Sequence, residues 1–152
     1  MAAADGAPPP PEFWNLYRHG FARVAVATPA LRPAEPAFNT SRIAVMAQEA
    51  DAAGALLLLT PELSLSAYAI DDLLQQGALL DAVEGSLQWL AAETAALRPL
   101  VLVGAPLRVA GRLHNCAVVL HRGRALGAVP KVHLPNYREF YEARHFASGA
   151  AA

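Results

Sequence analysis

The chain has 152 residues, of which 55% are hydrophobic and 16% are charged, and its formal net charge at pH 7 is −1. This length suits one domain, and the near-neutral charge gives no electrostatic footprint for nucleic acid or for an anionic membrane. No apolar run approaches the roughly 20 residues of a membrane span. The single cysteine, Cys116, excludes an internal disulfide and a cysteine-based zinc site, which fits a protein of the reducing cytoplasm.

Residues 1–12 are rich in alanine and contain four consecutive prolines. They lack the basic region and the apolar core of a signal peptide. We therefore expect a disordered leader here, followed by one domain over residues 13–152.

Strands and helices alternate in the first part of this domain. Phe21–Thr28 is predicted as a strand that Pro29 ends. Asn39-Thr40-Ser41 offers capping oxygens to a helix that Gly54 ends, and the continuous apolar run Ala55–Leu59 then predicts a strand covered on both faces.

The second helical region is predicted from Asp71 and Asp72 up to Pro99, and a buried strand follows at Leu100–Val103. Apolar or small side chains recur in this helix at helical spacing, at Val83, Leu87, Leu90, Ala91 and Thr94.

Short strands separated by glycine-bearing turns come next, at residues 107–109, 113–121 and 124–129. The chain is thus predicted as βαβαβ followed by a meander. This is an α/β fold with a largely parallel sheet, covered by helices on at least one face. For residues 137–152 we expect no regular element.

Two charged side chains follow apolar strands. Glu62 comes after Pro61 at the carboxyl end of the run Leu56–Leu59, and Lys131 follows the strand that ends at Val129. Functional groups collect at strand ends in open α/β sheets. A lone glutamate or lysine in a loop is more often a solvated surface residue, but apolar neighbours surround both. A carboxylate and an ammonium so placed can serve as a general base and an oxyanion stabiliser.

Cys116 is the one thiol that could act as a nucleophile. Strand alternation places it on the same face as Val118 and Leu120, so we expect it in the core. No metal site is expected, because no two histidines have the spacing of a metal-binding pair: His19, His114, His121, His133 and His145. The sequence also contains no glycine-rich phosphate loop.

Three segments resemble the nitrilase superfamily of carbon–nitrogen hydrolases, namely Phe13–Pro29, Pro61–Leu74 and Lys131–Glu142. Within it, they are similar to the glutaminase domain of the bacterial glutamine-dependent NAD(+) synthetases, from about Phe13 to Gly149. The run Tyr137–Glu142 and the stretch Tyr68–Leu73 are specific to that enzyme family.

The resemblance implies the first half of a nitrilase-like α-β-β-α sandwich and a Glu-Lys-Cys catalytic triad. Glu62 would be the general base and Lys131 the oxyanion stabiliser. Tyr137 would contact the bound glutamine, while Tyr68 and Phe140 would line the pocket.

The resemblance also implies what the chain does not contain. The nucleophilic cysteine of this family belongs after a later strand, beyond Ala152, and Cys116 does not match its motif. The domain over residues 13–152 is then a partial carbon–nitrogen hydrolase domain, truncated before that cysteine and before the synthetase domain. ATP and magnesium would act in the synthetase domain, no cofactor is expected in this segment, and the intact family forms homo-oligomers.

Thr60 departs from the family pattern, in which an apolar or aromatic residue usually precedes Pro-Glu, and its hydroxyl needs a partner. We expect the chain alone to be inactive. Two alternatives stay open, an amidase of another nitrilase branch and a non-catalytic half-domain that pairs with a partner chain through an exposed apolar sheet face.

Overall fold

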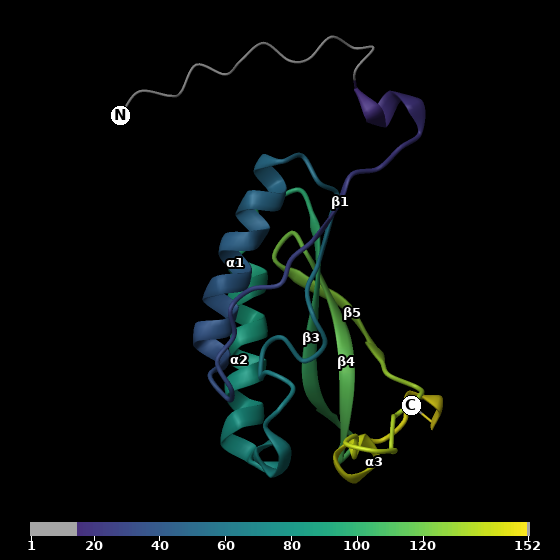
Figure 1. Cartoon of the computed structure of the whole chain (residues 1–152). Helices are drawn as coiled ribbons and strands as arrows, with labels where there is room; N and C mark the ends of the chain where they lie inside the picture. Colours follow the sequence, from purple (N-terminus) through teal and green to yellow (C-terminus); the bar gives the residue numbers. More distant parts are fainter. Residues whose placement is uncertain (1–14, 152) are drawn as a thin grey trace.

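The computed structural model describes residues 15–151, so the leader predicted at 1–12 lies outside the described residues. These residues form a five-stranded sheet in the order β1-β2-β3-β4-β5, and two long helices pack side by side on one face of it (Figure 1). This confirms the α/β prediction. The strands are β1 (Val24–Val26), β2 (Leu57–Leu59), β3 (Leu100–Val109), β4 (Arg112–His121) and β5 (Arg124–Pro130). The α-helices are α1 (Pro36–Ala52), α2 (Gly77–Glu93) and α3 (Glu142–His145).

Short 3-10 helices lie at Leu16–His19, Asp71–Gln75 and Gly149–Ala151. None of the helices within residues 15–151 is long and apolar enough to cross a membrane.

The sheet is parallel in one half and antiparallel in the other. β1 pairs with β2 and β2 with β3 in parallel, with α1 and α2 in the two crossovers. β3, β4 and β5 pair in antiparallel order through tight turns. The expectation of a largely parallel sheet therefore holds only for β1 to β3, because the meander contributes the longer strands.

The strands predicted at 100–103 and 107–109 are one continuous strand, β3. We expected residues 104–106 to break it, because Pro106 has no N–H to donate. Pro106 is opposite Asn115 of β4, whose carbonyl accepts instead from Lys131 on the β5 side. The pair is thus of the non-hydrogen-bonded kind, and β2 has already ended at this level, so the missing N–H costs no sheet hydrogen bond.

Both helix starts differ from the prediction. α1 begins at Pro36 rather than at Asn39, which is fully buried and bonds the backbone of Arg32 and the carbonyl of Leu65 instead of capping the helix. Asp71 opens a 3-10 helix, and α2 itself runs from Gly77 and ends at Glu93, short of Pro99. The tertiary contacts of these side chains override their local capping preference.

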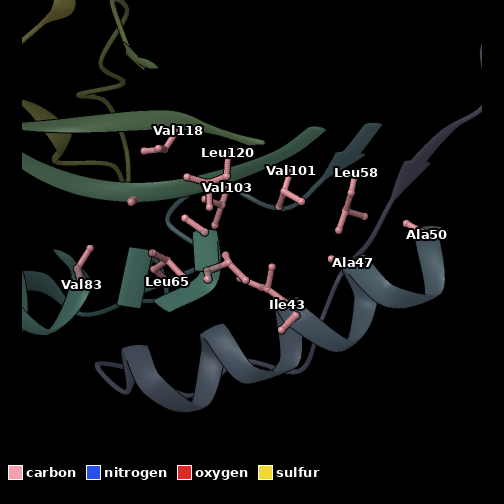
Figure 2. Packing of buried hydrophobic residues seen from close by; sticks show 14 of the residues in the cluster. Ile43, Ala47, Ala50, Leu58, Leu65, Val83, Val101, Val103, Val118 and Leu120 are labelled. Atoms are coloured by element: carbon pink, nitrogen blue, oxygen red, sulfur yellow. The ribbon is translucent and has the colours of Figure 1, made fainter. Parts of the chain in front are cut away.

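The hydrophobic core lies between the sheet and helices α1 and α2 (Figure 2). Ile43 and Ala47 from α1 face Leu58 of β2 and Val101 of β3, as Figure 2 shows. Each of these side chains is at most 1% exposed.

The other face of the sheet carries exposed apolar side chains. Strand alternation and register place Val24, Val26, Leu59 and Val129 there, and they are 61%, 75%, 41% and 65% exposed. This confirms the expected exposed apolar face. The strand predicted at 55–59 is accordingly covered by helices on one face only.

Leu58→Ala tests whether the core depends on the sheet–helix contact. We expect it to lower the free energy of unfolding by about 2–5 kcal/mol, because it leaves a cavity at a fully buried site. Leu126→Ala, at a residue 59% exposed on β5, is the matched control and should stay within about 0.5 kcal/mol. Urea denaturation measures both, and equal midpoints for the two variants would contradict this packing.

Candidate active site

Glu62 lies just beyond the carboxyl end of β2, as predicted. The backbone N–H of Thr60 extends the β2–β3 pairing by donating to the Leu102 carbonyl at 3.0 Å. The hydroxyl of Thr60 bonds Ser64 Oγ at 2.8 Å and the Leu102 carbonyl at 3.2 Å. These bonds supply the partner that a buried hydroxyl needs, so the departure from the family pattern at Thr60 is accommodated.

Gly104 lets the turn that carries Glu62 pack directly on β3. A methyl group at this position would overlap the backbone of Pro61, Glu62 and Leu63. The Gly104 carbonyl also accepts from the Leu65 N–H at 3.1 Å. Leu63 has a φ of 50°, in the left-handed region that non-glycine residues seldom adopt. The close packing against Gly104 holds this turn in a strained conformation.

Lys131 follows β5 and is anchored at both ends of its peptide unit. Its N–H donates to the Asn115 carbonyl at 2.8 Å, and its carbonyl accepts from Gly149 N–H at 2.9 Å. Gly149 belongs to the terminal segment in which we expected no regular element, and this segment contains α3 and a 3-10 turn. The segment thus helps to fix the backbone of Lys131.

The Lys131 ammonium lies between two carboxylates. Nζ donates to Glu62 Oε1 and to Glu142 Oε1, each at 2.8 Å. Glu142, at the start of α3, is 4% exposed, and its Oε1 also accepts from the Tyr68 hydroxyl at 2.7 Å. Side chains from three separate parts of the chain therefore meet in one ionic cluster.

The cluster keeps Lys131 protonated. Burial acts to lower the pKa of Lys131, but the hydrogen bonds with Glu142 and Glu62 outweigh it and the pKa lies above the ordinary lysine value. Burial, followed by the hydrogen bond to Glu142, raises the pKa of Tyr68. Tyr68 is therefore a hydrogen-bond donor to Glu142 over the whole physiological pH range.

A cavity of about 360 Å³ opens beside this cluster on the uncovered face of the sheet. Its walls include Glu62, Lys131, Asn115 and the backbone of Gly104. A substrate amide held there would meet a carboxylate and an ammonium at once.

Cys116 takes no part in this chemistry. It is 4% exposed and packs in the core with Val118 and Leu120, as predicted. Burial raises the pKa of its thiol, which disfavours the nucleophilic thiolate. No group of three metal-ligating side chains occurs among residues 15–151.

The three residues predicted to bind substrate lie in two different environments. Tyr68 and Phe140 line a small cavity together with Glu142, and the Tyr68 hydroxyl is engaged with that carboxylate. Tyr137 is 64% exposed and stacks edge-on against Phe140, with ring centroids 5.8 Å apart. Their roles toward glutamine remain predictions.

The family follows from a comparison with known proteins. The model of the carbon–nitrogen hydrolase family matches residues 23–151. The chain belongs to this family. The matched segment of this carbon–nitrogen hydrolase contains Glu62, Lys131 and Glu142 together with the whole sheet.

The relatives of this carbon–nitrogen hydrolase include glutamine-dependent NAD(+) synthetases of Mycobacterium tuberculosis and Mycobacterium leprae. The chain is 50% identical to the first over 137 residues and 42% identical to the second over 138 residues. The alignments cover 90% and 91% of this chain but 20% of each relative. The chain therefore spans about a fifth of the length of these relatives.

Solved structures agree with the nitrilase-like fold. The glutamine-dependent NAD(+) synthetase from Cytophaga hutchinsonii matches with a TM-score of 0.78 and 27% identity, over 84% of this chain and 22% of that one. An amidase from Nesterenkonia sp. AN1 in complex with acrylamide matches with a TM-score of 0.70 and 25% identity, over 84% of this chain and 48% of that one.

Sequence reasoning missed three residues of this carbon–nitrogen hydrolase site: Asn115, Gly104 and Glu142. An amide within the otherwise apolar run of β4 is a detectable signal, since a buried amide requires a partner. Glu142 gave no such signal, because its contacts with Lys131 and Tyr68 depend on how α3 folds back.

Gly104→Ala tests the close packing under Glu62. We expect a loss of about 1–3 kcal/mol in the free energy of unfolding, because backbone rather than a flexible side chain must move. Gly127→Ala, which meets open space on β5, should change stability by no more than about 0.5 kcal/mol. Thermal or urea denaturation distinguishes them, and a silent Gly104→Ala would rule out this contact.

Proposed function

We propose that this chain supplies the general base and the oxyanion-binding ammonium of a glutaminase that serves NAD(+) synthesis. The observation that carries the proposal is the cluster of Glu62, Lys131 and Glu142 beside a cavity on the sheet. The identity of 50% with a glutamine-dependent NAD(+) synthetase supports glutamine as the substrate rather than another amide.

In the first half of this reaction a cysteine thiol attacks the side-chain amide carbon of glutamine. Glu62 accepts the thiol proton and passes it to the leaving nitrogen, so that ammonia departs and a thioester forms. Water then attacks the thioester with the same carboxylate as base, which releases glutamate and the thiol.

Lys131 stabilises the oxyanion of each tetrahedral intermediate. An ammonium has three N–H donors, and two of those on Lys131 bond Glu62 and Glu142 among the described residues. The third is then available to the substrate oxygen. Glu142 holds the ammonium in place and, with Glu62, keeps it charged.

The nucleophile comes from outside this sequence, since Cys116 is its only cysteine and is buried in the core. The uncovered apolar face of the sheet borders the cavity and is the surface on which the rest of the sandwich packs. The Nesterenkonia amidase has an active-site cysteine to which acrylamide adds. A cysteine carried by the second half of the domain would reach Glu62 from this side.

The remaining assignments follow the same proposal. Tyr137 contacts the bound glutamine, and Tyr68 and Phe140 line its pocket. The ammonia passes to a synthetase domain, where ATP and magnesium support amidation of deamido-NAD. The intact enzyme works in the cytoplasm as a homo-oligomer.

A hybrid enzyme provides the test, in which this chain replaces the aligned segment of the Mycobacterium tuberculosis synthetase. We expect Glu62→Gln and Lys131→Met each to lower glutamine-dependent synthesis by at least about 100-fold, because each removes a group that acts in the transition state. Synthesis from added ammonia should be unchanged. Both rates are measured by NAD(+) formation.

Cys116→Ser is the matched control, and it should leave the ratio of glutamine-dependent to ammonia-dependent synthesis unchanged. Retained glutamine-dependent synthesis in Glu62→Gln or Lys131→Met would overturn the assigned roles. Equal loss with both nitrogen sources would indicate a structural effect instead.

A further inference from the structure

Asn115 lies within β4 and is 4% exposed. Its side chain is on the uncovered face of the sheet, on the opposite side from the core residue Cys116. A buried amide is costly unless it is bonded, and the partner of this one is the proposed base. We infer that Asn115 is a positioning residue that holds Glu62 in the orientation needed for proton transfer. This inference rests on the glutaminase proposed above.

The side-chain amide determines which oxygen of Glu62 is available. Asn115 Nδ2 donates to Glu62 Oε1, and Lys131 Nζ donates to the same oxygen at 2.8 Å. Both donors therefore occupy Oε1. Among residues 15–151 no side chain bonds Oε2, which is left to accept the proton of an incoming thiol.

The backbone of Asn115 positions the second catalytic group. Its carbonyl accepts from the Lys131 N–H at 2.8 Å, and across the sheet it pairs with Pro106, two residues beyond Gly104. One residue thus bonds Glu62 through its amide and Lys131 through its carbonyl. This arrangement sets the spacing between base and ammonium from a rigid strand rather than from the two loops that carry them.

The amide is the side chain that suits this place. Aspartate has nearly the same shape, but it has no donor and adds a negative charge beside Glu62. Leucine has a similar volume but no donor. Either replacement removes a hydrogen bond to the charged carboxylate, which therefore binds a proton at higher pH.

The experiment uses the hybrid synthetase with Asn115→Leu and Asn115→Asp. We expect glutamine-dependent kcat to fall by about tenfold to 100-fold, the usual effect of losing a hydrogen bond to a charged group. The acidic limb of the pH profile of kcat/KM should move to higher pH, further for Asn115→Asp. KM for glutamine and synthesis from ammonia should change less than about threefold.

Val118→Ala is the matched control, since Val118 lies on β4 but faces the core. It should lower Tm without moving the acidic limb. A purely structural role for Asn115 would instead give lower Tm, equal loss with both nitrogen sources and an unmoved acidic limb, and would overturn the inference. Full glutamine-dependent activity in either Asn115 variant would do the same.

The proposed function fails in a different way. In that case the unsubstituted hybrid makes NAD(+) from ammonia but not from glutamine, and both proposals fall together. A hybrid that uses glutamine and responds to Glu62→Gln but not to the Asn115 variants overturns only the positioning role. Because Asn115→Asp keeps the shape of the side chain, it carries the test if Asn115→Leu does not fold.

Discussion

The Lys131 ammonium shared between Glu62 and Glu142 is the interaction on which the rest of this site depends. Two carboxylates near one ammonium offset the cost of partial burial and keep the lysine charged. Glu142 is nearly inaccessible, so its charge relies on Lys131 and on the Tyr68 hydroxyl. Loss of the ammonium would leave a buried carboxylate without its counter-charge, which makes the lysine structural as well as chemical.

The sheet brings these groups together from distant parts of the sequence. The Glu62 turn packs on β3 because Gly104 has no side chain, and β4 carries Asn115 from there to the start of the Lys131 loop. The terminal segment then returns to bond the Lys131 carbonyl through Gly149. Long antiparallel strands give this arrangement a rigidity that the loops alone lack.

Much of the fold was predictable, because buried strands are marked by runs of valine and leucine and by glycine-bearing turns. The strands around Leu58, Val118 and Ala125 were found within a few residues. The start of α1 was not, because Asn39 bonds a neighbouring loop instead of capping a helix. Pro106 suggested a break that the one-sided pairing of β3 does not require.

The same distinction holds within the site. Glu62 and Lys131 were identifiable because each follows a recognisable strand, and Cys116 was correctly placed in the core by alternation. Glu142 and Asn115 depend on contacts between segments far apart in sequence, which local patterns do not encode. Identity with the synthetases, at 50%, favours that branch over the amidases, at 25%.

The central claim is that this chain carries the base and the ammonium of a glutaminase but not its nucleophile. The most direct measurement is ammonia release from glutamine by the purified chain, with Cys116→Ser alongside. The account predicts no ammonia from either protein. Release that Cys116→Ser abolishes would make Cys116 the nucleophile and would contradict both its place in the core and the roles assigned from the family.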